Sequence, residues 1–321
     1  IQEEKVMKKK VFIDGSEGTT GLRIFERFES RDDIELLKIP SELRKDPVEV
    51  KKYINESDIT FLCLPDAAAR EAVAMVENEN TIILDTSTAH RTEAGWAYGY
   101  PELSAAHREA IRTGKRIAVP GCYATGFITT AYALTAGGIL PKDYPVSAFA
   151  VSGYSGGGKK MIAQYQAQDK EKELSSARLY ALSQSHKHLK EMKAISGLER
   201  TPLFSPMVTD YYSGMTVSLT FYADMLNGRQ TPETVREYLA KHYAGEKFIT
   251  VQPLGAEAES GGVLFSSARS GWDGLEIYVT GNEDRIMVTT RFDNLGKGAS
   301  GAAIQCMNIV LGCEEDKGLT V

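Results

Sequence analysis

Apolar runs alternate with helical patterns along the first 140 residues. Short apolar runs predict strands, and the amphipathic stretches between them predict helices. The strands are expected at residues 11–13, 34–39, 59–64, 81–84 and 116–119, and the helices at 22–28, 48–54, 67–77 and 107–112. Runs that are apolar on both faces and separated by helices are typical of a parallel sheet buried on both sides. We therefore expect a doubly wound, Rossmann-like α/β domain.

The pattern changes after Pro141, where strands become grouped. Strands are expected at 146–151, 214–222, 262–267, 275–280 and 285–292, and helices at 159–182 and 232–243. This grouping predicts an α+β domain with a mixed or antiparallel sheet. A last helix, 298–311, has one apolar stripe and is expected to pack back on the first domain. The predicted domains are residues 7–142 with 297–321, and residues 143–296.

Composition and charge restrict the class of protein. The chain has 321 residues, of which 42% are hydrophobic and 25% charged, as in globular proteins. Its net charge of −6 argues against a nucleic-acid partner. No run approaches the roughly 20 apolar residues of a membrane helix. Four cysteines do not make a disulfide scaffold, and the first residues lack an apolar signal core. We expect a cytoplasmic protein whose natural start is Met7.

A glycine-rich turn follows the first strand. Its glycines are spaced G-x-x-G-x-x-G, and hydroxyl residues lie between them: Gly15, Ser16, Gly18, Thr19, Thr20 and Gly21. Such a turn lets the free N–H groups of a helix N-terminus face a pyrophosphate. The alternative is an ordinary strand-to-helix turn, but its place after strand one favours a dinucleotide site.

The end of the second strand bears on the choice of cofactor. NAD-binding proteins usually place a carboxylate there for the ribose 2′-hydroxyl. Here Ser41 is followed by Arg44 and Lys45, which suit a 2′-phosphate. Glu42 is a contrary sign, because a carboxylate suits the 2′-hydroxyl of NAD. The sequence favours NADP, and the alternative is a solvated basic loop.

Cys122 is the candidate nucleophile. It follows a buried strand and Gly121, and it opens a helix in which the dipole favours a thiolate. The carboxyl ends of the strands of a doubly wound sheet are where ligands bind. The alternative is a small buried core thiol. A thiolate beside a nicotinamide would accept an acyl group and present it for reduction.

This chemistry needs a proton donor, and histidine suits neutral pH. His186 and His188 are the candidates, and only one of them is expected to meet Cys122. Glu191 lies three residues after His188 and would orient that ring if the segment is helical. The alternative is a surface histidine pair. No metal site is expected, because no further ligands have suitable spacing.

A second loop suits an anion. It follows the strand at 146–151, precedes a helix, and carries hydroxyls, bare backbone and lysines. Its candidate anion-binding residues, for a phosphate or a carboxylate, include Ser152, Gly153, Ser155 and Gly156. The spacing does not match a P-loop, and the alternative is a flexible turn.

Taken in order, these residues resemble a known family. The set is Gly15-x-x-Gly18-x-x-Gly21, Gly-Cys-Tyr-Ala-Thr at 121–125, His186-x-His188-x-x-Glu191, and Asn-Leu-Gly-Lys-Gly-Ala-Ser-Gly at 294–301. It resembles N-acetyl-gamma-glutamyl-phosphate reductase, within the semialdehyde dehydrogenase superfamily. Residues 85–92 and 98–103 resemble the shorter type of that enzyme.

The resemblance implies NADP-dependent reduction of N-acetyl-glutamyl 5-phosphate to the 5-semialdehyde, in arginine biosynthesis, with release of phosphate. Cys122 would be the nucleophile, and His188 is preferred to His186 as the acid/base. The 152–158 loop would line the substrate pocket, together with Glu191. Lys297 and Gly298 would lie near the nicotinamide. The first domain would bind the dinucleotide, and the second would carry catalysis and homo-oligomerisation, as a dimer or tetramer.

Three alternatives remain open. An aspartate-semialdehyde dehydrogenase performs the same chemistry on a shorter amino acid, although its histidine motif differs. An NADP-binding redox sensor would bind cofactor without turnover, and a cysteine hydrolase would not consume NADPH. The blocking group on the substrate amine, acetyl or succinyl or a carrier, is also open.

Overall fold

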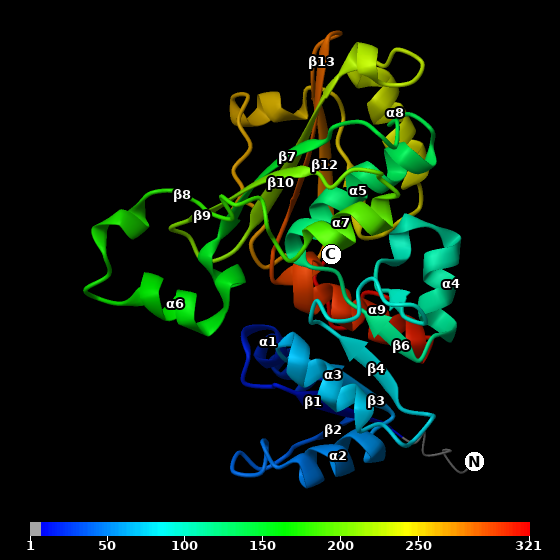
Figure 1. Cartoon of the computed structure of the whole chain (residues 1–321), viewed down its shortest axis with the longest axis vertical. Helices are drawn as coiled ribbons and strands as arrows, with labels where there is room; N and C mark the ends of the chain where they lie inside the picture. Colours follow the sequence, from blue (N-terminus) through cyan, green and yellow to red (C-terminus); the bar gives the residue numbers. More distant parts are fainter. Residues whose placement is uncertain (1–7) are drawn as a thin grey trace.

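The first sheet has six strands, all parallel, in the order β2-β1-β3-β4-β6-β5. The computed structural model describes residues 8–321, so the expected start at Met7 lies outside the described residues. The strands are β1 (Lys9–Asp14), β2 (Ile34–Leu37), β3 (Ile59–Leu62), β4 (Ile82–Asp85), β5 (Ala97–Tyr98) and β6 (Arg116–Ala118). This sheet confirms the doubly wound fold (Figure 1).

Helices cover both faces of the first sheet. They are α1 (Thr19–Phe28), α2 (Pro47–Glu56), α3 (Asp66–Ala74), α4 (Ala105–Thr113) and α9 (Gly301–Leu311). Ile24 and Phe28 of α1 share one core with Ile111 of α4 and the apolar stripe of α9. Helices α2 and α3 pack in a separate core on the opposite face. The C-terminal helix α9 therefore lies against the first sheet, although it is far from that sheet in sequence.

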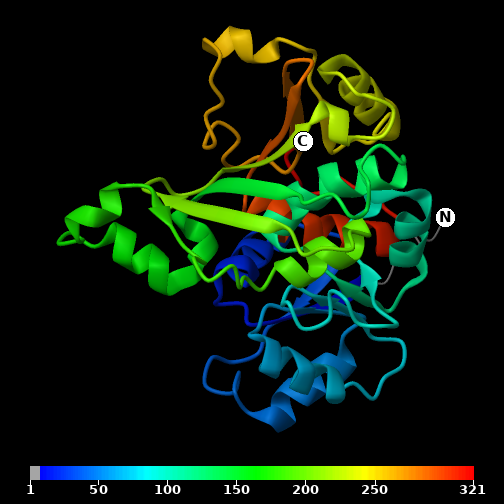
Figure 2. The same ribbon diagram turned by 45° about the horizontal axis from the view of Figure 1, so that its top comes forward.

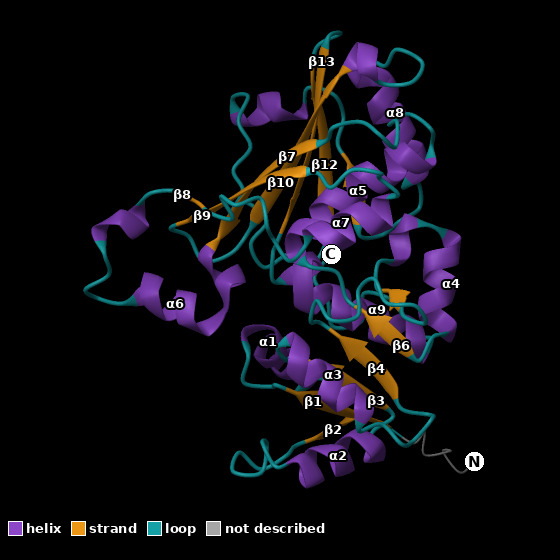
Figure 3. Ribbon diagram, viewed as in Figure 1, coloured by secondary structure: helices purple, strands orange, loops and turns teal. Residues whose placement is uncertain are grey.

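The second sheet is mixed and has the order β11-β12-β13-β10-β7-β9-β8. β7 pairs with β9 and β11 with β12 in parallel, and the other pairs are antiparallel. The strands are β7 (Ser147–Gly153), β8 (Arg178–Leu179), β9 (Leu203–Thr209), β10 (Met215–Tyr222), β11 (Ile249–Val251), β12 (Leu275–Gly281) and β13 (Arg285–Phe292). Figure 3 shows the two sheets, one above the other.

Three helices pack in the core on one face of this sheet: α5 (Cys122–Ala136), α7 (Leu189–Ser196) and α8 (Pro232–His242). Helix α6 (Gly158–Gln166) belongs instead to a smaller cluster with Tyr154 and Val208. Short 3-10 turns lie at 101–103, 154–157, 172–175, 223–225 and 256–260, and a π-turn lies at 296–300. Helix α5 is buried almost all round and packs on α7, α8, β10 and β13. It therefore belongs to the core of the second sheet, although it lies within the predicted first domain. The predicted domain division stays a prediction.

Two expected elements are wrong. The strand at 262–267 is an irregular loop, because Gly261 and Gly262 have positive φ and Val263 and Phe265 are exposed. The helix expected at 159–182 ends at Gln166, since the charged stretch after it offers no apolar stripe. That segment instead makes an excursion that projects from the molecule and returns as β8 (Figure 2).

Sequence patterns also missed the strand β9. Pro206 lies in its middle, which argues against a strand. The Pro206 carbonyl accepts from the Tyr180 N–H at 3.2 Å on the side of β8, so the missing proline N–H faces that thinly paired edge. A proline is tolerated there because few partners need its donor.

Candidate active site

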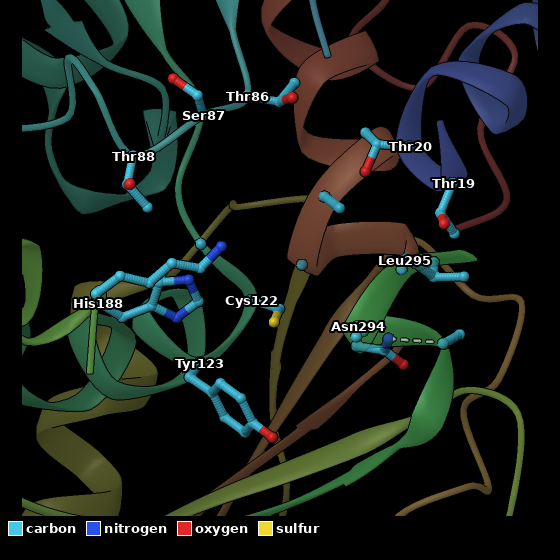
Figure 4. A pocket seen from close by; sticks show the side chains of 18 of the residues that line it. Thr19, Thr20, Thr86, Ser87, Thr88, Cys122, Tyr123, His188, Asn294 and Leu295 are labelled. Carbon is cyan, nitrogen blue, oxygen red and sulfur yellow. Dashed lines mark hydrogen bonds between the residues drawn. The ribbon is translucent and has the colours of Figure 1, made fainter. Parts of the chain in front are cut away.

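One cavity of about 490 Å³ lies where the carboxyl ends of the first sheet's strands meet the second sheet. Its lining residues come from seven chain segments: 18–20, 63–66, 86–91, 119–123, 152–161, 180–188 and 294–299. Figure 4 shows side chains from both halves of the chain turned toward it. The sequence-predicted nucleophile, both histidines and part of the glycine turn therefore share one space.

Cys122 is the first residue of α5 and lines the cavity. Burial raises the pKa of the Cys122 thiol, whereas the Tyr123 backbone N–H and the Arg91 guanidinium act to lower that pKa. The sequence predicts that the helix dipole favours the thiolate, whereas in the folded chain the net shift of the thiol pKa is upward, with burial as the largest cause. In the resting protein, the thiol is therefore the favoured form.

His188 immediately precedes α7 and packs against the backbone of Gly121. A Cβ on Gly121 would lie 2.4 Å from His188 Nε2 and 2.5 Å from Arg91 Nη1, so only glycine admits the two side chains. Burial holds the pKa of His188 well below its ordinary value, with further lowering by Arg91. A neutral imidazole thus lies next to the residue that precedes Cys122 (Figure 4).

His186 also lines the cavity, but its ring has a backbone partner. Its Nδ1 accepts a hydrogen bond from the His188 N–H at 3.2 Å. Burial lowers the pKa of His186 to about 4, so the ring stays neutral and keeps this acceptor at neutral pH. Among residues 8–321, by contrast, Nδ1 of His188 has no hydrogen-bond partner.

Glu191 does not orient the His188 ring as the helical register suggested. Its carboxylate accepts from Arg91 Nη1 at 2.5 Å, from the Tyr98 hydroxyl at 2.8 Å and from the Gly121 N–H at 3.3 Å. Glu191 is 2% exposed and lies outside the cavity lining. Its structural effect is to tie α7 to the backbone just before the nucleophile.

Arg91 is a site residue that sequence reasoning missed. Its Nε donates to the Val119 carbonyl at 2.8 Å, Nη1 to Glu191, and Nη2 to the Thr86 carbonyl at 2.9 Å. These bonds use three of its five N–H groups, and the side chain lines the cavity. A signal was available, because residues 85–92 follow the end of a predicted strand of the parallel sheet.

The glycine turn has the shape that a phosphate group needs. A Cβ on Gly15, whose φ is +82°, would lie 2.4 Å from the Cys63 carbonyl oxygen, and one on Gly21 would lie 2.4 Å from the Gly15 oxygen. Gly18, Thr19 and Thr20 line the cavity, and Oγ1 of Thr19 is buried with no hydrogen-bond partner within residues 8–321. A bare helix N-terminus with an orphaned hydroxyl is the expected donor set for a pyrophosphate.

The remaining predicted cofactor residues are divided between two places. Ser16 and Ser41 line a second cavity of about 210 Å³, together with Lys38, which lies 5.0 Å from the Phe25 ring centre. Arg44 forms an ion pair with Glu17, and both are partly exposed. Gly298 lines the main cavity, and a Cβ there would lie 2.9 Å from that of Cys122.

Lys297 was expected near the nicotinamide, but its ammonium points away from the cavity. It is 1% exposed, and Nζ donates to Glu102 Oε1 and to Gln305 Oε1, each at 2.6 Å. It also faces the rings of Tyr100 and Phe248. A buried ammonium needs such partners, and they draw the side chain into the protein.

The predicted substrate loop does face the cavity. Ser152, Gly153, Ser155 and Gly156 all line it. Asn294, which prediction did not single out as a binding residue, donates to Ser155 Oγ at 3.0 Å and accepts from the Gly214 N–H at 2.9 Å. Figure 4 shows the Asn294 amide across the cavity from His188.

Two features are absent from residues 8–321. No helix among them combines the length and apolar character that a bilayer crossing requires. No group of three or more His, Cys, Asp or Glu side chains in this part of the chain is arranged to hold a metal ion.

Two family models match the chain. Residues 10–112 match the model described as semialdehyde dehydrogenase, NAD binding domain, and residues 122–294 match semialdehyde dehydrogenase, dimerisation domain. The solved structure of aspartate semialdehyde dehydrogenase from Francisella tularensis is similar, with a TM-score of 0.71 and 15% identity over 95% of this chain and 100% of that one. At that identity the likeness concerns the fold alone.

Curated relatives are more similar in sequence. The chain is 43% identical over 320 residues to N-acetyl-gamma-glutamyl-phosphate reductase 2 of Nostoc sp., covering 97% of this chain and 99% of that protein. It is 44% identical over 310 residues to N-acetyl-gamma-glutamyl-phosphate reductase of Brucella ovis, covering 95% and 100%.

Proposed function

Because the chain belongs to the semialdehyde dehydrogenase family, and within it to the N-acetyl-gamma-glutamyl-phosphate reductases, we propose that it reduces N-acetyl-glutamyl 5-phosphate to the 5-semialdehyde. One observation carries the proposal. A cysteine at a helix N-terminus, a neutral imidazole and a glycine turn with an orphaned hydroxyl line the same cavity. An acyl-transfer reduction needs these three groups together.

Cys122 forms the covalent bond in this mechanism. His188 takes the thiol proton. Burial keeps its imidazole neutral and so able to accept, and it raises the pKa of the Cys122 thiol, which therefore needs a base when its sulfur attacks. The sulfur attacks the acyl carbon, the bond from that carbon to the phosphate oxygen breaks, and phosphate leaves with the bonding electrons. The product is a thioester on Cys122. After reduction, the protonated His188 gives its proton to the hemithioacetal oxyanion. The hydroxyl then returns this proton to His188 as the carbon–oxygen double bond re-forms and the carbon–sulfur bond breaks, so the aldehyde leaves and Cys122 is released as the thiolate.

Arg91 is the group best placed to hold the substrate phosphate. Its guanidinium lines the cavity and retains two N–H groups beyond the three that the protein uses. Its positive charge also favours the thiolate once the proton has left Cys122. The hydroxyls of Ser152 and Ser155 supply further polar groups in the lining.

The cofactor is proposed to be NADP. Its nicotinamide, when bound, supplies the hydride that reduces the acyl carbon. The glycine turn and Thr19 would hold the pyrophosphate, and Ser16, Lys38 and Ser41 would surround the 2′-phosphate in the smaller cavity. The ammonium of Lys38 favours a phosphate there over a bare hydroxyl.

The chain is also proposed to form a homo-oligomer in the cytoplasm, through the open face of the second sheet. Phe149, Leu203 and Tyr222 lie on one face of neighbouring strands and are 39%, 59% and 59% exposed. An apolar face of this kind is typical of an interface between subunits. The division into a dinucleotide-binding part, 7–142 with 297–321, and a catalytic part, 143–296, is likewise proposed.

The test is the reverse reaction with purified protein. A panel of N-acetyl-glutamate, N-succinyl-glutamate and aspartate semialdehydes is oxidised with phosphate and either NADP or NAD, followed by absorbance. We expect the N-acetyl substrate with NADP to react fastest. Preference for aspartate semialdehyde, or cofactor binding with no turnover, would refute the proposal in favour of the aspartate enzyme or a redox sensor.

The covalent step has its own variant. Cys122→Ser should abolish turnover and leave NADPH binding nearly intact, because the glycine turn is separate from the thiol. Fluorescence titration of NADPH checks the second half of this prediction. Substantial residual activity would refute the thioester.

A further inference from the structure

Gln184 fastens the segment that carries both histidines to the edge of the second sheet. Its side-chain Nε2 donates to the Phe204 carbonyl at 2.9 Å, and the Phe204 N–H donates to Gln184 Oε1 at 2.9 Å. Two bonds between one amide and one residue's backbone fix orientation as well as distance. The contact joins residues 20 positions apart.

The strand register explains why a side chain is needed there. β8 pairs with β9 only through Arg178 opposite Val208 and Leu179 opposite Met207, followed by the Tyr180 N–H on the Pro206 carbonyl. Continued pairing would bring position 182 opposite Phe204. The chain turns away instead, so the Gln184 amide occupies the place of the absent strand and satisfies the free edge groups.

The turn has a conformation that few side chains adopt. Ala181 and Gln184 have φ of +53° and +56°, and the Gln184 N–H closes the turn on the Ala181 carbonyl at 2.9 Å. Residues other than glycine are uncommon in this left-handed region. The turn after β8 therefore has an unfavourable backbone conformation. The hydrogen bonds between Gln184 and Phe204 stabilise it and so direct the chain toward the cavity.

Phe204, which Gln184 contacts, packs against neighbours of the reacting residues. The Phe204 ring packs edge-on against His186 and against Tyr123, with ring centres 5.3 Å apart in both cases. Tyr123 adjoins Cys122 in sequence, and His186 Nδ1 accepts from the His188 N–H. The residue that Gln184 holds is thus packed against Tyr123, next to the thiol in sequence, and against His186, which is bonded to the His188 backbone.

We propose that Gln184 is a positioning residue for proton transfer between Cys122 and His188. This inference rests on the proposed function, because it takes that transfer as part of the reaction. Gln184 does not touch the reacting atoms in this arrangement. It keeps the 180–188 segment at the distance from β9 that places His188 over Gly121.

The experiment compares Gln184→Ala, Gln184→Gly and Gln184→Glu with the unmodified protein. Alanine and glycine both remove the amide, and glycine also removes the left-handed strain. Glutamate keeps an acceptor for the Phe204 N–H but loses the donor to its carbonyl. Gln230→Ala is the matched control, since that amide also donates to a backbone carbonyl, that of Asn227, in a loop before α8.

We expect kcat to fall about 10-fold in Gln184→Ala and Gln184→Gly, part of the roughly 10²–10⁴-fold that a placed acid/base group contributes. The kcat of Gln184→Glu should lie between the kcat of these two variants and that of the unmodified protein. The KM for NADPH and the Tm should stay unchanged. The rate at which iodoacetamide alkylates Cys122 at neutral pH should fall, because a displaced His188 no longer accepts the thiol proton as the sulfur attacks.

Two results would overturn the inference. One is an unchanged kcat and alkylation rate in Gln184→Ala. The other is a parallel loss of kcat, NADPH affinity and Tm, or recovery in Gln184→Gly, which would show a general or purely conformational effect. The alkylation rate does not require turnover. If the unmodified protein does not react with the acyl phosphate, the proposed function fails, and the alkylation result still decides the role of Gln184 in positioning the pair.

Discussion

The variant Glu191→Gln should lower stability and raise thiol reactivity at the same time. Glu191 is the counter-charge of Arg91, and both side chains are buried, at 2% and 8% exposed. Glutamine keeps the shape but leaves the guanidinium without an anion. Removing one partner of a buried pair costs about 3–5 kcal/mol. Arg91 keeps its carbonyl partners Val119 and Thr86, so we expect a cost near the lower limit, about 3 kcal/mol.

The same substitution, which weakens the fold, is expected to make the Cys122 thiol more reactive. The Arg91 charge lowers the pKa of the Cys122 thiol, and the Glu191 charge raises it. Neutralising Glu191 therefore lowers the thiol pKa, and alkylation at neutral pH becomes faster.

Urea denaturation measures the free energy of unfolding, and iodoacetamide alkylation as a function of pH measures the thiol pKa. Cys122→Ser supplies the background rate of the other cysteines. Glu102→Gln is the matched control: it is as buried as Glu191 and pairs with Lys297, so it should destabilise the fold without moving the thiol pKa. An unchanged unfolding free energy in Glu191→Gln, or a higher thiol pKa, would refute the electrostatic account.

The remaining predictions concern the acid/base group, the cofactor and pH. His188→Asn should lower kcat about 10²–10⁴-fold, and His186→Asn should lower it less; the reverse order in steady-state assays would exchange the two roles. Ser41→Asp should raise the Kd for NADPH by repelling the 2′-phosphate, Ser41→Ala is its neutral control, and equal affinities would remove Ser41 from the site. Burial lowers the pKa of His186 from 6.5 to about 4, so the unfolded chain binds more protons in that interval. Stability should accordingly be lost as pH falls from 6.5 toward 4, and chemical denaturation of His186→Asn should show a flatter dependence unless another group is responsible.

Several elements of the site were predictable from the chain alone. The glycine turn and the first turn of α5 are local features, since a strand end, a glycine and a helix start follow one another in sequence. The doubly wound first sheet was also predictable, because burial on two faces leaves continuous apolar runs. The second sheet was predictable from the grouping of strands after Pro141. The excursion after α6 was not, since its charged stretch has no periodicity that separates helix from loop.

By itself, the sequence determined which residue types are available and where short-range patterns place them: Cys122 at a helix start, and a glycine turn after β1. Only the tertiary structure decided their partners. Glu191 pairs with Arg91, 100 positions away, rather than with the nearby His188, and Lys297 turns inward to Glu102. Helical register and chain proximity describe neighbours within one element. A buried charge, however, must find its partner in whichever segment packs against it, because an unpaired charge in the interior is too costly to keep.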